Sequence, residues 1–153
     1  MYQLLANMYL NKIKFIFRPL SYAAFFLAGS FLLHASSKEI PLVNEEVRLK
    51  AAREYLAGQP NQIAIFTKGL VCSSCGIGLR IHLARIKNID QQQLDDGILI
   101  DAKKQLIVIA LKAGTSPDFA KITKAIYKAG YEPRHFYHRV GQDITQMEAP
   151  EIN

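Results

Sequence analysis

Two cysteines, Cys72 and Cys75, are the only thiols in this sequence of 153 residues, and they lie three positions apart in the stretch GLVCSSCGIGLR. A pair with this spacing can form a disulfide, act as a redox switch, supply half of a zinc site, or bind a soft metal ion without other ligands. The thiolate is the form of cysteine that reacts and binds metals, and soft ions such as Cu(I) prefer it. The pair is therefore the first candidate for chemistry.

Zinc requires more ligands than the cysteines provide, because structural zinc sites usually have four. The chain contains four histidines. His34 belongs to an apolar N-terminal segment, and His82 is expected on the surface about two helical turns beyond Cys75. His135 and His138 are three positions apart on a predicted strand, where their side chains point to opposite faces. Zn(II) is therefore disfavoured, whereas Cu(I) and Hg(II) accept two sulfur ligands in a near-linear site.

The elements around the cysteines are expected to place them at the start of a helix. QIAIF (62–66) predicts a strand, and residues 75–86 carry apolar side chains at helical spacing. Cys72 then lies in the loop after the strand, and Cys75 lies at the first turn of the helix. Backbone N–H groups and the helix dipole at this place lower the pKa of a thiol.

The rest of the chain predicts an α+β domain. Two β-branched runs on either side of AKKQ predict a hairpin over 97–111. Residues 115–130 predict a helix with Ser116 as its cap and Pro117 at its first position. EPRHFYHRV (132–140) predicts the last strand. The order strand, helix, strand, strand, helix, strand is that of the ferredoxin-like βαββαβ sandwich, an antiparallel sheet with two helices on one face.

An extra N-terminal helix is predicted at 44–57, where Asn44 can act as the cap and the sequence GQP ends the helical pattern. The second strand of the hairpin, LIVIAL, is apolar on both of its faces, although two helices can cover only one face of the sheet. We therefore hypothesise that helix 44–57 packs on the other face.

The N-terminus has the layout of a secretory signal or an N-terminal membrane anchor. Basic NKIKFIFR precedes an uncharged, apolar block, and Ala35 and Ser37 supply the small residues expected before a cut after Ser37. The block is slightly shorter than the ~20 residues of a spanning helix. Either use places the remainder in the periplasm or otherwise outside the cytoplasm. The expected divisions are 1–37 signal or anchor, 38–60 helical extension and linker, 61–140 the βαββαβ domain, and 141–153 a frayed polar tail.

Charge and composition argue against nucleic-acid binding and against catalysis. Lys and Arg outnumber Asp and Glu by 19 to 13, but three of these positive charges, Lys12, Lys14 and Arg18, belong to the N-terminal segment. No basic run with interleaved aromatics is present, and no strand leads into a glycine-rich phosphate loop. No proton-transfer pair or activated nucleophile stands out, so we do not expect an enzyme.

Two groups of residues near the cysteines have both a structural and a functional interpretation. Ile77 and Ile81 lie off the apolar stripe of their predicted helix, and we expect them to widen its buried face; the alternative is an apolar rim that docks a partner. Arg80, Arg85 and Lys128 are expected to form a solvated face; the alternative is that they steer an acidic partner domain by long-range attraction.

Residues 62–138, about half of the chain, resemble a heavy-metal-associated domain, the module of copper chaperones, metal-pump N-terminal domains and the periplasmic mercury-binding protein. GLVCSSC matches the Gly-Met-Thr-Cys-x-x-Cys loop of that family at Gly69, Cys72 and Cys75. AIYKAGY, ending at Tyr131, is similar to the end of the second helix of the family. The cysteine pair alone would be a weak signal, whereas the pair, the element order and the Ala-Gly-Tyr ending together are more specific.

The resemblance implies a role for each matching residue. Cys72 and Cys75 would be the ligands of one soft ion, and Tyr131 would lie beside them, shielding the site or bonding to a sulfur. Leu70 replaces the methionine of the family, which is a buried prop rather than a ligand. Val71 replaces the usual threonine and removes a hydroxyl from the loop.

The function implied is that of a monomeric carrier, which holds Cu(I) or Hg(II) and passes it by thiolate exchange to a metal transporter or another metal-binding domain. The alternative is an exported thiol–disulfide oxidoreductase that uses the same cysteines, because exported proteins meet oxidising conditions. Thioredoxin-like proteins, however, place a proline and a strand opposite the cysteines, whereas Pro117 is expected at a helix start. A third interpretation is an interaction domain with a structural disulfide, although so short a loop stabilises little.

Overall fold

The computed structural model describes residues 41–72 and 76–152. The chain divides into two units, Met1–Glu39 and Ile40–Asn153, and the described residues all belong to the second. The signal or anchor expected at 1–37, with its cut after Ser37, lies outside the described residues and stays a prediction. Across 41–72 and 76–152, no helix has both the length and the apolar character needed to cross a bilayer.

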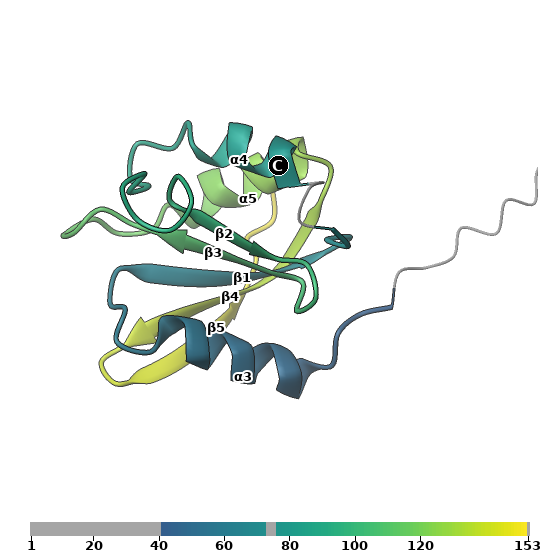
Figure 1. The fold of residues 1–153 in the computed structure, drawn as a ribbon, viewed down its shortest axis with the longest axis horizontal. Helices are drawn as coiled ribbons and strands as arrows, with labels where there is room; N and C mark the ends of the chain where they lie inside the picture. Colours follow the sequence, from purple (N-terminus) through teal and green to yellow (C-terminus); the bar gives the residue numbers. More distant parts are fainter. Residues whose placement is uncertain (1–40, 73–75, 153) are drawn as a thin grey trace, which may run out of the picture. The chain divides into compact units, whose positions relative to one another are not determined.

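The second unit is an α+β domain, which confirms the predicted fold class, and its described part contains three helices and a five-stranded antiparallel sheet (Figure 1). The strands lie in the order β2-β3-β1-β4-β5. The elements in chain order are α3 (Glu45–Leu56), β1 (Gln62–Lys68), α4 (Ile77–Leu83), β2 (Ile98–Asp101), β3 (Leu106–Ala110), α5 (Phe119–Lys128), β4 (Glu132–Val140) and β5 (Asp143–Glu148).

Helices α4 and α5 cover one face of the sheet, and α3 covers the other (Figure 1). The alternation of β1 divides its side chains between two apolar cores, because successive residues of a strand point to opposite faces. Ile63 and Ile65 join the core beneath α4 and α5. Ala64 and Phe66 join the core beneath α3.

Helix α3 explains why β3 is apolar on both faces. Ala52 and Leu56 of the helix pack against Val108 of β3 in the second core. All five residues of β3 are buried, so the strand is covered from both sides.

Arg48 of α3 lies over the sheet, with its guanidinium carbon 3.6 Å from the centre of the Phe66 ring. Such a cation over an aromatic face is attracted by the electrons of the ring.

The β2–β3 hairpin has the connection predicted from sequence, since β2 ends at Asp101 and β3 begins at Leu106. The four residues between them are the predicted AKKQ. Leu99 pairs with Val108 and Ile100 with Ile107 in an antiparallel register.

The C-terminal tail is ordered as a strand, so the expectation of a frayed tail over 141–153 was wrong. Residues Asp143–Glu148 form β5 and pair with β4 in register from Val140 to His135. Ile144 and Met147 contact the two cores from opposite faces of β5. The sequence signal for this strand is weak because only these two of its six residues are apolar, and its hydrogen bonds depend on the free edge of β4.

Two helix boundaries also differ from expectation. Helix α5 is capped by Asp118 rather than Ser116, because the Asp118 carboxylate accepts a 3.0 Å hydrogen bond from the backbone N–H of Lys121. Pro117 therefore precedes the cap instead of occupying the first helical position. Helix α4 covers Ile77–Leu83 rather than 75–86.

Candidate functional site

The loop that carries Cys72 begins where β1 ends, and we call its described residues, 69–72, the cysteine loop. Gly69 has a φ angle of +89°, in the left-handed region that favours glycine, and turns the chain away from the strand. Leu70 then enters the core beneath α4 and α5 with 0% exposure, whereas Val71 is 55% exposed. The buried leucine thus anchors a loop whose next side chain faces water.

Tyr131 lies against the start of this loop. A Cβ atom placed on Gly69 would lie 3.8 Å from Cδ1 of Tyr131, which is ordinary van der Waals contact. Tyr131 reaches this position because α5 ends one turn earlier and the Tyr131 N–H donates to the carbonyl oxygen of Ile126 at 3.2 Å. The structure therefore brings Tyr131 against Gly69, at the start of the loop that carries Cys72.

Gly76, just before α4, lies close to β2. Gly76, which follows Cys75, is buried, and a Cβ atom placed there would overlap Cδ1 of Ile100. Glycine thus allows the chain to enter α4 directly against the side chain of Ile100. Gly69, after β1, thus lies near Tyr131, and Gly76, before α4, lies near Ile100.

Cys72 is half-buried and forms part of a disulfide. No cysteine within the described residues is free. Cys75, the second cysteine of the chain, lies outside the described residues. A sulfur in a disulfide is neither a thiolate nor a metal ligand, so Cys72 must be reduced before it can bind an ion.

His135 and His138 point to opposite faces of β4, which confirms the prediction from their spacing. His135 stacks near Phe66 on the α3 side of the sheet, with ring centres 5.9 Å apart, and His138 lies 5.7 Å from the ring of Phe119 on the α5 side. The Nε2 atom of His135 is 2.9 Å from Oε1 of Glu148. Over the described ranges, no group of three or more His, Cys, Asp or Glu side chains could hold a metal ion.

Two apolar side chains of α4 differ from the sequence interpretation. Ile77 is 65% exposed and Ile81 is 50% exposed, so they do not widen the buried face. The reason is that α4 is short and reaches the core through Leu79 and Leu83 alone, on the side that faces α5 and the sheet. Val71, in the cysteine loop, is a further exposed apolar side chain.

Arg80 was interpreted as part of a solvated face, but it is engaged within the chain. Its guanidinium forms a 2.7 Å ion pair with Asp95 and donates to the carbonyl oxygens of Asp95 and Ile98 at 2.6 and 2.9 Å. Arg80 therefore holds α4 against the β2 edge, and it is not available to attract a partner. Asp95 lies in the long segment between α4 and β2, and sequence spacing alone could not pair it with Arg80.

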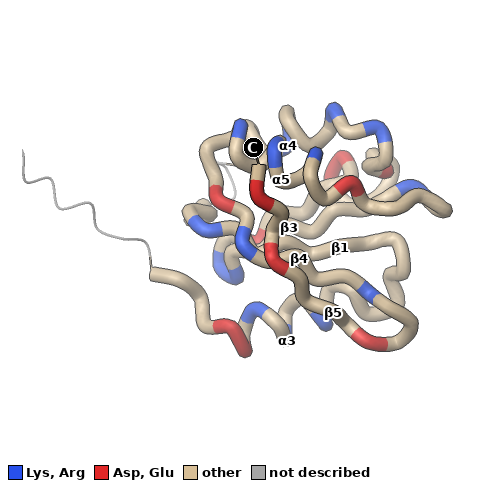
Figure 2. Tube along the Cα trace, turned by 180° about the vertical axis from the view of Figure 1, so that it is seen from behind, with Lys and Arg blue, Asp and Glu red and all other residues tan. Residues whose placement is uncertain are grey.

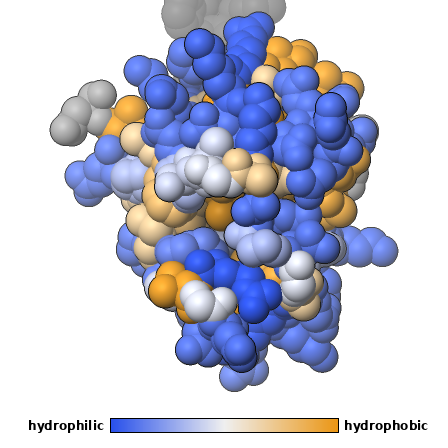
Figure 3. Space-filling model, turned by 90° about the vertical axis from the view of Figure 1, so that its left-hand side faces the viewer, coloured by the Kyte–Doolittle hydropathy of each residue, from blue (hydrophilic) through white to orange (hydrophobic). Residues whose placement is uncertain are grey.

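Lys121 and Lys124, which were not singled out from the sequence, line a groove between α4 and α5 together with His82, Arg85 and Lys128. Their signal was present in the sequence, because residues 121, 124 and 128 recur at the spacing of one helix face. Figure 3 shows one face of the molecule, which is mostly hydrophilic with apolar areas between the hydrophilic ones.

Comparison with known proteins gives no match: no protein-family model, no curated protein and no solved structure matches this chain. The resemblance to heavy-metal-associated domains rests on the quoted residues of the sequence alone.

Proposed function

We propose that the reduced chain binds one soft heavy-metal ion, Cu(I) or Hg(II), between Cys72 and Cys75 and delivers it outside the cytoplasm. The observation that carries the proposal is the construction of the cysteine loop. Cys72 is half-exposed in a loop that Leu70 anchors in the core and that Tyr131 borders. Cys72 is thus not buried in the core, while Leu70 fixes the backbone just before it.

The fold supports the same proposal. Strands β2-β3-β1-β4 with helices α4 and α5 on one face have the arrangement expected of a ferredoxin-like sandwich. We propose that these elements form a heavy-metal-associated domain, to which α3 and β5 are additions at the second face and at the β4 edge. The cysteine loop then joins the first strand and the first helix of the domain, as the resemblance implies.

The chemistry requires both sulfurs in the reduced state. An external dithiol would transfer two electrons to the disulfide, yielding two thiols here and a disulfide in the donor. The two thiolates would then clasp the ion, releasing their protons to solvent. Delivery needs no further electrons: a thiolate of the acceptor, a metal transporter or another metal-binding domain, bonds to the ion as one cysteine leaves it. Zn(II) would bind more weakly, because it lacks two further ligands.

One specific observation favours a second candidate function. The disulfide at Cys72 is the oxidised form expected of an exported thiol–disulfide oxidoreductase. In that case a substrate thiolate would attack the sulfur of Cys72, the other sulfur of the disulfide would leave as a thiolate, and the product would be a mixed disulfide. The two candidates share the same cysteines and differ in whether the reduced pair retains an ion.

Anaerobic titration of the reduced full chain with Cu(I), Hg(II) and Zn(II) distinguishes them. We expect a one-to-one complex with a soft ion that is lost in both Cys72→Ser and Cys75→Ser. The matched control is Val71→Ser, which changes an exposed neighbour in the same loop and removes no sulfur, and it should bind as wild type does. A reduced pair that binds no ion but exchanges rapidly with small disulfides would instead establish the oxidoreductase.

A further inference from the structure

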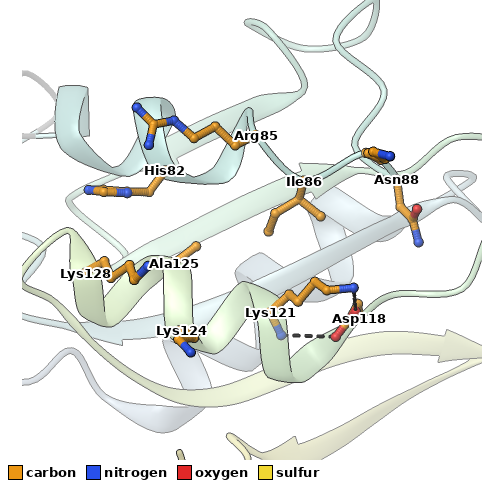
Figure 4. Close-up of a pocket in the computed structure, with 10 residues that line it drawn as sticks. His82, Arg85, Ile86, Asn88, Asp118, Lys121, Lys124, Ala125 and Lys128 are labelled. Carbon is orange, nitrogen blue, oxygen red and sulfur yellow. Dashed lines mark hydrogen bonds and ion pairs between the residues drawn. The ribbon is translucent and has the colours of Figure 1, made fainter.

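A groove of about 500 Å³ runs between α4 and α5 and is open to solvent. Figure 4 shows His82 and Arg85, from the end of α4 and the segment after it, across from Lys124 and Lys128 of α5. Ile86 and Ala125 supply apolar walls between them. The volume is in the range of sites for small molecules, about 300–1,000 Å³.

Interactions within the chain bound one end of the groove. The side-chain amide of Asn88 donates a 3.1 Å hydrogen bond to the carbonyl oxygen of Ser116, which ties the segment after α4 to the segment before α5. At the same end, Lys121 and Asp118 form an ion pair of 2.7 Å (Figure 4). The charges of Lys121 and Asp118 therefore neutralise each other.

The other end of the groove is positive and uncompensated. Five Lys and Arg side chains line the groove against one carboxylate, which is Asp118. Among the described residues, Arg85, Lys124 and Lys128 form no ion pair. Figure 2 shows Lys and Arg positions on α4, on α5 and in the segments that join them. Lys124 and Lys128 are four residues apart on α5, where like charges repel each other, and a bound anion would relieve this repulsion.

The form of the groove favours a compact anion over an extended acidic chain. A phosphomonoester concentrates nearly two negative charges and three acceptor oxygens in one group, so a guanidinium fork and two ammonium groups can contact it together. A carboxylate offers one charge and two oxygens. Lys121 at the bounded end is already paired with Asp118, so it offers no free charge to an extended acidic segment.

We propose that the groove between α4 and α5 binds a small phosphomonoester, with its phosphate between Arg85, Lys124 and Lys128. The organic part of the ligand lies over Ile86 and Ala125, toward the end bounded by Asn88. His82 stands at the phosphate end and can add a further donor. The inference does not depend on metal binding, because no lining residue is a cysteine.

The test is calorimetric titration of the full chain with glycerol 2-phosphate at low ionic strength. We expect saturable one-to-one binding that Arg85→Gln and Lys124→Gln each weaken about tenfold, the usual size for loss of one charge-assisted contact. The matched control is Lys103→Gln, which removes an exposed positive charge in the β2–β3 connection, away from the groove, and it should bind as wild type does. Cys72→Ser should also bind as wild type does, and this separates the result from the metal titration.

Four outcomes would overturn the proposal. Equal weakening by Lys103→Gln and Arg85→Gln would show only non-specific attraction, and an absence of saturation would show no site. Succinate or an oligoglutamate peptide binding as tightly as glycerol 2-phosphate would identify the groove as a surface for acidic partners. Binding to phosphatidylglycerol vesicles, with no binding of glycerol 2-phosphate, would identify it as a membrane-contact face.

Discussion

The hydroxyl of Tyr55 in α3 donates a 2.8 Å hydrogen bond to Oδ2 of Asp101 at the end of β2. This bond joins the helix on one face of the sheet to the β2–β3 hairpin. Burial of the phenol, followed by its hydrogen bond to Asp101 and the negative charge of that residue, raises the pKa of Tyr55 to about 12. The neutral phenol is therefore the form that stabilises the packed helix.

Replacing Tyr55 by phenylalanine should lower the free energy of unfolding by about 1 kcal/mol, the net value of one such hydrogen bond. Urea unfolding at neutral pH measures the change. The matched control is Tyr127→Phe, since Tyr127 is 47% exposed and its hydroxyl has no hydrogen bond within the described residues. Equal losses in the two variants would contradict a specific role for the Tyr55 hydroxyl.

The same pair predicts a pH dependence at the alkaline end. An unfolded tyrosine loses its proton near pH 10, whereas Tyr55 in the folded chain loses it near 12. Between these values the folded state binds more protons, so its stability falls as the pH rises. The contribution is complete below about pH 10. Tyr55→Phe should show a smaller fall between pH 10 and 12 in the same unfolding measurement, and an unchanged fall would contradict the assignment.

Neighbouring residues of the cysteine loop should differ sharply in their effect on stability. Leu70→Ala should cost about 2–5 kcal/mol, because it removes a fully buried side chain and leaves a cavity. Val71→Ala should change the free energy of unfolding by less than about 0.5 kcal/mol, because Val71 faces water. Thermal or urea unfolding tests both, and similar costs would mean that Leu70 does not anchor the loop.

Gly69→Ala should alter the reactivity of the cysteines as well as the stability. Alanine at a φ of +89° costs roughly 1–2 kcal/mol, since a Cβ atom crowds the backbone in this region. Gly114→Ala is the matched control, because Gly114 has a φ of +74° and nothing within 4 Å of an added Cβ.

Both glycine variants should lose similar stability, but only Gly69→Ala should change the rate at which iodoacetamide alkylates the reduced chain. The reason is that Gly69 turns the loop that carries Cys72, whereas Gly114 lies in a different loop. Identical alkylation rates in wild type and Gly69→Ala would show that this turn does not position the sulfur.

Removal of β5 should destabilise the domain. A chain that ends at Gly141 loses the packing of Ile144 and Met147 and exposes the edge of β4, at a cost of about 2 kcal/mol for two partly buried side chains. A chain that ends at Ala149 keeps the strand and the Ala149 N–H bond to Arg134, so it should match the full chain in urea unfolding. Equal stability of the two shortened chains and the full chain would instead support the frayed tail predicted from the sequence.

Local patterns in the sequence determined most of the elements. Repeats of apolar residues at helical or alternating spacing placed α5, β4 and the β2–β3 hairpin with its AKKQ connection, because these periods come from the geometry of the backbone. They also identified Leu79 and Leu83 as the buried side of α4. Gly69, Leu70 and Tyr131 were named through the family resemblance, and the structure places Tyr131 against Gly69.

The tertiary structure alone decided how each face is used. Ile77 and Ile81 are exposed because α4 is covered on one side only, and Arg80 is occupied because the fold brings Asp95 to it. Strand β5 exists because β4 presents a free edge, and the basic groove exists because α4 and α5 pack side by side. A local pattern shows which side chains share a face, but what covers that face depends on residues far away in the chain.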